Sequence, residues 1–308
     1  MYLSVIIPAF NEKESILFVL EELELVIQDL KFIENYEIIV VDDHSTDGTL
    51  EKIKNLKNSK LSAIRLSKQS GSHNAIRAGL SVCNGDIAFY LSADGQDDPK
   101  ILGDMTPLIK KGAQVVWAQR ANTNEPFFSN ILRILFYFAL KLTTKNTTVD
   151  PSSADYFLIG RKMIDAINTC NERNTSLYGL ISWIGFKQVT IIYKRRKRAR
   201  GESKWNFKSR LKLASDWIIS FSGIPLRVIT YLGFFTAIAG LIYAGFITAL
   251  GIMELTTPGW AETIIITLFL GGVQMIMLGV TGEYIWRSLE ETRKRPVFII
   301  EESVNIEK

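Results

Sequence analysis

The sequence predicts an α/β protein with a mostly parallel sheet, followed by a C-terminal hairpin of two transmembrane helices. Two observations predict this class. In residues 1–120, short runs rich in Ile, Val and Ala alternate with segments of helical periodicity. Such alternation is typical of a parallel sheet covered by helices on both faces. Near the C-terminus, two long runs contain no charged residue, which is typical of membrane-spanning helices.

Five strands are expected in the N-terminal part, because five short apolar runs are each bounded by polar residues or glycine. These runs are 5–9, 37–41, 61–66, 87–91 and 114–118. After the first strand we expect a helix that begins at Asn11, with Glu14 at the spacing of a capping box. Since the first strand begins almost at once, no secretory signal is expected and the N-terminus should belong to the folded domain.

The two uncharged runs, 228–253 and 263–282, contain 26 and 20 residues. A bilayer core of roughly 30 Å needs about 20 helical residues, so both runs are long enough to cross it. Two buried helices of a soluble core are the alternative, which the lack of a charged face disfavours. The linker 254–262 has no Lys or Arg, whereas basic residues flank the other ends. The positive-inside rule therefore predicts a multi-pass protein of the inner (plasma) membrane with both termini cytoplasmic.

The formal net charge of the chain is only +4, but one segment is strongly basic. Residues 194–212 contain ten Lys or Arg and one acidic residue, Glu202. Nucleic-acid binding and a solvated run of charge are alternatives. We favour binding to anionic lipid headgroups, since the predicted spans follow closely. The neighbouring stretches 127–142 and 207–221 mix apolar residues with Lys and Arg. We expect them to be helices at the membrane interface, with core helices as the alternative.

Composition excludes several classes of protein. Hydrophobic residues make up 47% and charged residues 22% of the chain, which excludes a disordered protein. The two cysteines, Cys83 and Cys170, lie far apart and only two histidines are present, so a disulfide scaffold and a zinc module are both unsupported. Neither GxGxxG nor GxxxxGK[ST] occurs, which argues against a dehydrogenase and a P-loop enzyme.

Polar residues follow three of the expected strands at the point where each strand ends. Asn11 and Glu12 follow the first strand, 42–48 the second and 92–98 the fourth. Helix capping is the ordinary explanation for any one of these groups. The carboxyl ends of parallel strands, however, meet at the edge of the sheet where ligands bind. Carboxylates gathered there suit Mg²⁺ or Mn²⁺ bridging to phosphate oxygens.

These polar segments resemble the signatures of family 2 glycosyltransferases, which have the GT-A fold. The resemblance lies in 4–12 (SVIIPAFNE), 41–49 (VDDHSTDGT) and 93–96 (ADGQ). The second half, with 198–205 (RARGESKW) ahead of the two apolar runs, is similar to the polyisoprenyl-phosphate branch. That branch includes dolichol-phosphate mannose synthases and bactoprenol glucosyltransferases. The resemblance covers essentially the whole chain.

The resemblance implies a nucleotide-sugar donor and a membrane-embedded polyprenyl phosphate acceptor. The residues that it implies for the donor nucleoside are Pro8, Ala9, Asn11, Glu12 and Asp43. It further implies that Asp94 and Gln96 hold Mg²⁺ or Mn²⁺ on the diphosphate, and that Asp155 is a second catalytic carboxylate. The residues that it implies for the acceptor phosphate are Arg120, Arg133, Arg200, Ser203 and Lys204.

Two positions depart from the family pattern. Ser92 stands where the family usually has the first Asp of Asp-x-Asp-x-Gln, so one negative charge is missing at the metal site. Its hydroxyl can still bind the ion or orient a water molecule. Leu158 stands where the family has Arg in Phe-Arg-Leu, which removes a basic side chain from the acceptor side.

The predicted reaction needs little acid–base assistance, because a polyprenyl phosphate is already anionic. The departing diphosphate needs a cation, which Asp94 would hold while Asp155 orients the acceptor or the sugar. We therefore predict inverting, metal-dependent transfer of a hexose, with UDP-glucose as the expected donor, to undecaprenyl phosphate at the cytoplasmic membrane face for cell-envelope glycans. The alternatives are another lipid or polysaccharide acceptor, and a non-catalytic membrane scaffold that binds a nucleotide sugar.

The expected domain boundaries follow from this organisation. A cytoplasmic GT-A domain is expected over 1–205, juxtamembrane amphipathic helices over 206–227, two transmembrane helices over 228–286 and a cytoplasmic tail over 287–308. The small residues Gly271, Gly272 and Gly279 permit close helix contacts, so a homo-oligomer formed through the transmembrane helices stays open.

Overall fold

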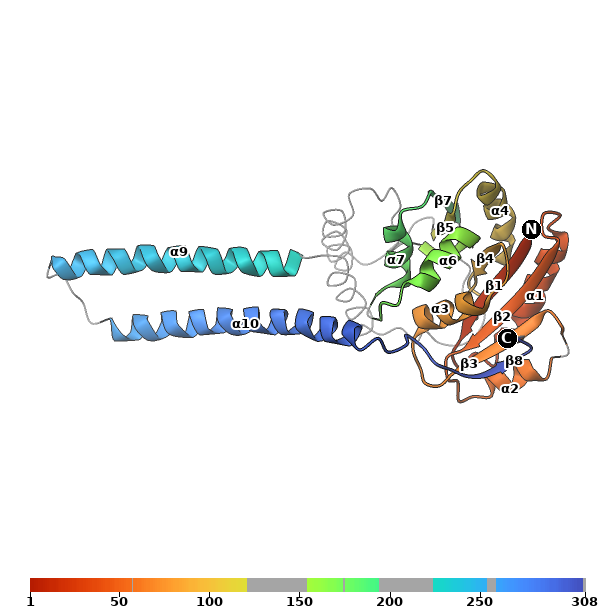
Figure 1. The fold of residues 1–308 in the computed structure, drawn as a ribbon, viewed down its shortest axis with the longest axis horizontal. Helices are drawn as coiled ribbons and strands as arrows, with labels where there is room; N and C mark the ends of the chain where they lie inside the picture. Colours follow the sequence, from red (N-terminus) through yellow and green to blue (C-terminus); the bar gives the residue numbers. More distant parts are fainter. Residues whose placement is uncertain (57, 121–153, 174, 194–223, 254–258, 307–308) are drawn as a thin grey trace.

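A mixed β-sheet organises the domain on the right of Figure 1, and a hairpin of two long helices extends from it. The computed structural model describes residues 1–56, 58–120, 154–173, 175–193, 224–253 and 259–306. Within these residues the sheet has eight strands in the order β7-β5-β6-β4-β1-β2-β3-β8. They are β1 Tyr2–Ala9, β2 Asn35–Asp42, β3 Leu61–Leu66, β4 Ile87–Tyr90, β5 Val115–Arg120, β6 Ala154–Gly160, β7 Gln188–Tyr193 and β8 Ile300–Val304.

The pairing of the strands confirms the predicted fold class. Strand β1 is parallel to β2 and β4, β2 is parallel to β3, and β5 is parallel to β7. Strand β6 is antiparallel to both β4 and β5, and β8 is antiparallel to β3. The five strands expected from the sequence are β1 to β5, whereas β6, β7 and β8 were not predicted.

Helices cover both faces of the sheet, as the two separate hydrophobic clusters show. The helices of the domain are α1 Ile16–Asp29, α2 Thr49–Lys54, α3 Ser72–Val82, α4 Leu102–Lys110, α6 Arg161–Thr169 and α7 Leu177–Ile184, with a short 3-10 turn at Pro99–Ile101. Along β1, Val5 and Ile7 join the cluster with α1, while Ile6 joins the opposite cluster with α3. Burial of each such side chain contributes about 1.5–3 kcal/mol.

The first helix begins later than the sequence predicts. Helix α1 starts at Ile16, and Ser15 precedes it without a side-chain capping bond, so the prediction of a start at Asn11 is wrong. Asn11 has a φ of 54°, in the left-handed region that asparagine tolerates better than most residues. Its polar groups bond to the loop after β2, which leaves them unable to cap a helix.

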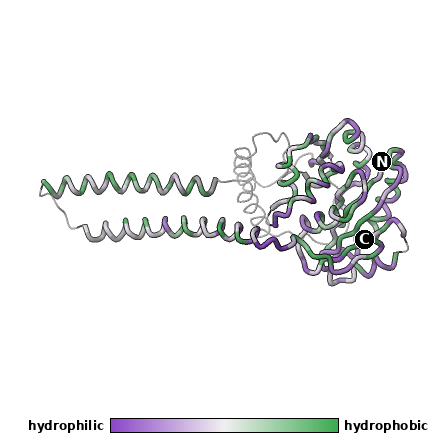
Figure 2. Tube along the Cα trace, in the orientation of Figure 1, coloured by the Kyte–Doolittle hydropathy of each residue, from purple (hydrophilic) through white to green (hydrophobic). Residues whose placement is uncertain are grey.

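The hairpin consists of α9 (Ile224–Ile252) and α10 (Trp260–Thr292), which run antiparallel beside each other. Figure 2 shows hydrophobic residues along α9 and hydrophilic ones where α10 joins the domain. In the part of the chain that is described, Val228–Leu250 is the helix long and apolar enough to cross a membrane. Helix α10 contains the second uncharged run, 263–282.

After α10 the chain returns to the sheet. Strand β8 pairs with the edge strand β3, with Ile64 opposite Ser303. Next to this ladder, the Ser67 amide donates to the Ile299 carbonyl at 2.9 Å and the Ser62 hydroxyl to the Asn305 carbonyl at 2.9 Å. The range 287–308, expected as a tail, therefore supplies the edge strand of the sheet. The basic segment 194–212 and the stretches 127–142 and 207–221 lie outside the described residues.

Candidate active site

The carboxyl ends of β1, β2 and β4 meet at one edge of the sheet. From β1 the sheet continues through β2 and β3 on one side and through β4 on the other, so the chain changes direction between β1 and β4. Ligands of open α/β sheets bind outside the carboxyl ends of the strands at such a switch point. Asn11, Asp43 and Asp94 follow these three strand ends, so the fold brings the predicted residues to one place.

The loop after β1 is fastened to the loop after β2. The backbone amide of Asn11 donates to the Ser45 hydroxyl at 2.9 Å, and the Asn11 side-chain oxygen accepts from the Thr46 amide at 2.8 Å. The Glu12 amide donates to the Thr49 hydroxyl at 3.0 Å. Three hydrogen bonds thus hold the two loops as one unit at the predicted nucleoside site.

Asp47 completes this unit from the other side. Its carboxylate accepts hydrogen bonds from the Lys13 amide at 3.1 Å and from the Thr49 hydroxyl at 2.5 Å. Burial, the largest single influence, raises the pKa of Asp47, but these bonds and that from the Thr49 amide together leave its pKa below the ordinary value. The carboxylate is therefore charged at neutral pH, and the bonds to it are of the stronger, charge-assisted kind.

Asp43 fixes the loop that leads into α3. This side chain is only 4% exposed, and its two oxygens accept the backbone amides of Ser70 at 2.6 Å and Gly71 at 2.9 Å. Burial raises the pKa of Asp43, and these two bonds act in the opposite direction. The Asp43 amide also donates to the carbonyl of Ala9 at 2.9 Å. Asp43 thus holds together three segments around the predicted nucleoside pocket, next to Pro8 at the end of β1.

Asp94 lies in the turn after β4 with its carboxylate oriented by two neighbours. The Ser92 hydroxyl donates to Asp94 Oδ1 at 2.7 Å, and the Gln96 amide donates to the same oxygen at 3.1 Å. Gly95 between them has a φ of 71°, a conformation that glycine adopts without steric cost. The residue that departs from the family pattern, Ser92, therefore orients the remaining carboxylate.

The donor set of this turn fits a divalent ion held mainly by its substrate. Among the described residues, no group of three or more His, Cys, Asp and Glu side chains could hold a metal by itself. Mg²⁺, however, usually keeps several waters and binds through one or two carboxylates plus substrate phosphates. One oriented carboxylate, that of Asp94, meets that requirement when substrate phosphates and water supply the other ligands.

The backbone places two further predicted residues at the same edge. Strand β5 ends at Arg120, and the antiparallel β6 starts at Ala154, which pairs with Gln119. Because β6 is antiparallel to β4 and β5, its start, with Asp155 as the second residue, lies at the edge of the sheet where β4 and β5 end. The other predicted acceptor residues lie outside the described part of the chain, namely Arg133, Arg200, Ser203 and Lys204.

Arg65 was missed by the sequence analysis. It contacts the loop after β2 from strand β3. Arg65 is the only charged residue of the predicted strand 61–66, and this was the signal that could have singled it out.

Comparison with known protein families matches two separate parts of the chain. The model of "Glycosyl transferase family 2" matches residues 4–167, more than half of the chain, and that of "GtrB C-terminal hairpin" matches residues 224–287. The chain belongs to glycosyl transferase family 2. The prediction of a glycosyltransferase with a GT-A domain and a C-terminal hairpin is thereby confirmed.

Relatives of this glycosyltransferase match it over nearly its whole length. An uncharacterized glycosyltransferase of Synechocystis is 33% identical, over 99% of this chain and 96% of the relative. The bactoprenol glucosyl transferase of Shigella phage SfII is 33% identical, over 98% of both chains. The crystal structure of a mycobacterial protein shares the fold, with 17% identity, a TM-score of 0.51 and coverage of 71% of this chain and 74% of that chain.

Proposed function

We propose that this glycosyltransferase transfers glucose from UDP-glucose to a polyprenyl phosphate, such as undecaprenyl phosphate, at the cytoplasmic face of the membrane. The observation that carries the proposal is the likeness to bactoprenol glucosyl transferases, which spans the catalytic domain and the hairpin together. Bactoprenol is a polyprenyl lipid, and a chain that joins a sugar-transfer domain to an apolar hairpin is suited to such an acceptor.

The donor nucleoside binds, in this proposal, against the two loops that follow β1 and β2. Pro8, Ala9, Asn11 and Glu12 form one wall, and the hydrogen bonds from Asn11 to the second loop keep that wall in place. Both carboxylate oxygens of Asp43 accept hydrogen bonds from backbone amides. We therefore assign it to shaping the pocket through the loop before α3. Such preformed walls lower the entropic cost of binding.

Asp94 and Gln96 hold the divalent ion, Mg²⁺ or Mn²⁺, at the donor diphosphate. When bound, this ion offsets the negative charge that develops on the departing nucleoside diphosphate. Ser92 keeps Asp94 oriented through its hydroxyl. That hydrogen bond favours an active enzyme over the alternative of a non-catalytic scaffold, which the replacement of Asp by Ser had raised.

The acceptor is bound, in this proposal, by residues of the neighbouring strands β5 and β6. Asp155 orients the acceptor or the sugar, and Arg120 at the end of β5 contributes to binding the lipid phosphate. Arg133, Arg200, Ser203 and Lys204 complete the proposed phosphate site on the strength of the resemblance. The phosphate oxygen attacks the anomeric carbon from the face opposite the diphosphate, so we expect inversion without a general base.

Both hairpin helices cross the membrane in this proposal. Helix α9 starts on the side of the catalytic domain, and β8, which follows α10, belongs to the catalytic sheet. Because both outer ends lie with the domain, the hairpin would cross the bilayer an even number of times, with the link between α9 and α10 outside. The domain boundaries at 205, 227 and 286 stay predictions, as does an oligomer formed through the helices.

A panel of donors tests the proposed function. The full chain, purified in detergent with Mg²⁺ or Mn²⁺, is given undecaprenyl phosphate and one of UDP-glucose, UDP-GlcNAc, UDP-galactose or GDP-mannose. Mass spectrometry of the lipid should show a glucosyl phosphate lipid with UDP-glucose, and none with undecaprenol, which lacks the phosphate. Absence of a lipid product with every donor would refute the proposal, and a product from another nucleotide sugar alone would refute the choice of glucose.

A further inference from the structure

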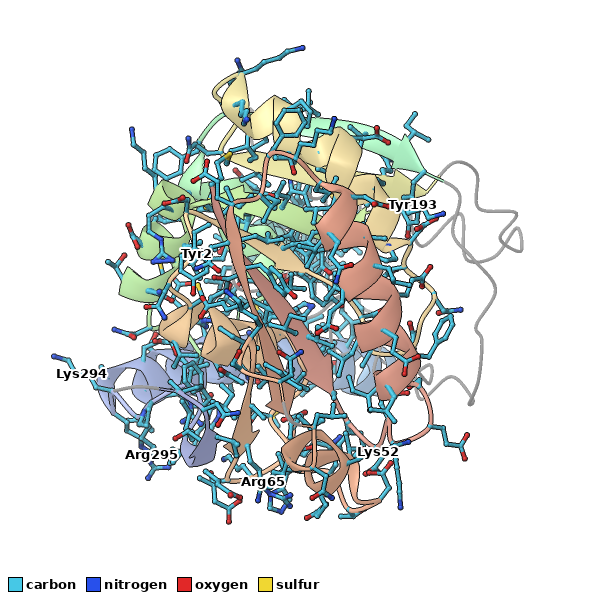
Figure 3. The ribbon with its side chains drawn as sticks, turned by 90° about the vertical axis from the view of Figure 1, so that its right-hand side faces the viewer. Tyr2, Lys52, Arg65, Tyr193, Lys294 and Arg295 are labelled. Atoms are coloured by element: carbon cyan, nitrogen blue, oxygen red, sulfur yellow. The ribbon has the colours of Figure 1, made fainter. Side chains whose placement is uncertain are left out.

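Arg65 joins the C-terminal strand to the loop after β2. Its guanidinium contacts Asp42 Oδ2 through Nη1 at 3.2 Å, the Ser45 carbonyl through Nη2 at 3.1 Å and Glu301 Oε2 through Nε at 3.3 Å. Figure 3 labels Arg65 in the lower part of the domain, where the segment with Lys294 and Arg295 also lies. Each nitrogen of the planar guanidinium thus has an oxygen partner, and these partners come from two segments.

The segment that Arg65 holds is the turn that supports the predicted nucleoside wall. Asp42 is fully buried at the end of β2, and its carboxylate accepts the Ser45 amide at 3.2 Å. The Ser45 hydroxyl in turn accepts the amide of Asn11 at 2.9 Å. A shift of Ser45 would therefore move Asn11, so the position of Arg65 bears directly on the donor site.

Glu301 fixes the third side of this guanidinium from β8. The pairing of β8 with β3 brings Glu301 to this position, and its Oε2 also lies 3.8 Å from Nδ1 of His44. Without the Glu301 carboxylate, Nε of Arg65 loses its ion-pair partner. The planar guanidinium can then rotate more freely about the side-chain bonds. The side chain of Glu301 is 50% exposed, and ion pairs this exposed add little to folding stability. Its contribution is therefore expected in the position of Arg65.

We propose that Glu301 is a positioning residue for donor binding, acting through Arg65 on the loop 42–49. The strand that follows the hairpin thereby sets the geometry of the nucleotide-sugar pocket at the other end of the chain. The inference rests on the proposed function for its effect on the donor, while its effect on the loop does not depend on that function.

The neighbouring Glu302 provides a matched control. It lies on the same strand, its side chain is 44% exposed, and it pairs with Lys54 of α2 at 2.6 Å. We expect Glu301→Gln to raise the KM for the nucleotide sugar by about three- to tenfold while kcat changes less than about twofold. Glu302 stands opposite Arg65 in the strand register, but its carboxylate pairs with Lys54. Glu302→Gln therefore leaves the contacts of Arg65 with Asp42, Ser45 and Glu301 in place, and both constants should stay unchanged.

Amide hydrogen exchange of the full chain without donor separates the two proposals. We expect exchange in the segment 42–49 to be faster in Glu301→Gln than in the wild type and in Glu302→Gln. Failure of every donor to react would overturn the proposed function, and the exchange rates would still decide the role of Glu301. Equal exchange in wild type and Glu301→Gln, or an equal increase in Glu302→Gln, would overturn that role.

Discussion

His73 connects the donor side of the sheet to α7 without being part of the predicted site. Its Nδ1 accepts the backbone amide of Leu177 at 3.3 Å, and its ring lies 5.2 Å from the ring of Tyr178. Burial lowers the pKa of His73 to about 4 from the ordinary 6.5. The imidazole is therefore neutral in the folded protein at neutral pH, as its acceptor role toward Leu177 requires.

His73 should contribute a loss of stability as the pH drops from 6.5, its ordinary pKa, to about 4, its pKa in the folded protein. In this window the unfolded state binds a proton at His73 that the folded state does not, so the free energy of unfolding decreases by roughly 1–3 kcal/mol. Thermal unfolding of the full chain in detergent at several pH values measures this. His73→Gln, whose side-chain oxygen can accept from Leu177, should flatten the dependence, and an unchanged slope in that variant would contradict the assignment.

The positions of the candidate site residues were predictable from sequence where a motif fixes both the residue and the strand end that it follows, while their roles stay predictions. Asn11, Asp43 and Asp94 reach the same edge for that reason. The hydrogen bond from Ser92 to Asp94 was not predictable, because the direction of a hydroxyl depends on the turn around Gly95. The contact between Arg65 and Glu301 depends on pairing between distant parts of the chain, which no local pattern reports.

Helix α3 packs closely on β1 through Gly79. A Cβ atom at this position would overlap Cγ2 of Ile6 and lie 3.1 Å from Cγ2 of Val41. Both neighbours are buried β-branched side chains of central strands, which have little room to move. This contact sets how near α3, and the loop ahead of it, approach the sheet.

Gly79→Ala should therefore lower the free energy of unfolding by about 1–3 kcal/mol through overpacking. Gly103→Ala is the matched control, because the nearest atom to a Cβ there is the end of Leu30 at 3.4 Å. In helix α4 that change should be neutral or stabilising by up to about 1 kcal/mol. The shift in thermal midpoint measures both, and a Gly79→Ala protein as stable as the wild type would disprove the close packing.

At the level of elements, the sequence predicts those whose pattern is local. Strands β1 to β5 are apolar runs with clear ends, and each is found close to its expected position. Strand β8 has the sequence IEESV, whose charged residues do not predict a strand. It forms one only through its pairing with β3. The start of α1 was misplaced because Asn11, a favourable capping residue, is used instead to join two loops.

At the scale of the whole molecule, the C-terminal hairpin is joined to the catalytic domain at both of its ends. Helix α9 follows the catalytic domain in sequence, and α10 is followed by β8 in the sheet. At the same junction, the backbone amide of Arg173 donates to Glu291 of α10 at 3.1 Å. Such attachment limits how the domain can tilt relative to the hairpin and hence, in the proposed function, relative to the lipid acceptor.

Cysteine labelling tests the proposed topology. In a parent with Cys83 and Cys170 replaced by alanine, Met253→Cys at the end of α9, an exposed position, should react with an impermeant maleimide in intact spheroplasts. Ser303→Cys on β8 should react only after the cells are permeabilised, because the proposed topology places the catalytic domain, and β8 with it, in the cytoplasm. Labelling of Met253→Cys only after permeabilisation would contradict a hairpin that crosses the membrane twice.

The central claim, that Asp94 holds the divalent ion, is tested most directly by the rate at which Asp94→Asn transfers glucose from UDP-glucose to undecaprenyl phosphate. The rate is measured at increasing concentrations of Mg²⁺ or Mn²⁺. Asparagine keeps an oxygen for the Gln96 amide but loses the charge that would hold the ion, so we predict a fall in kcat of about 10²–10³. Asp98→Asn is the control from the same loop, since its side chain accepts from the Lys100 amide at 3.0 Å and asparagine can do the same. Wild-type turnover with unchanged metal dependence in Asp94→Asn would contradict the account.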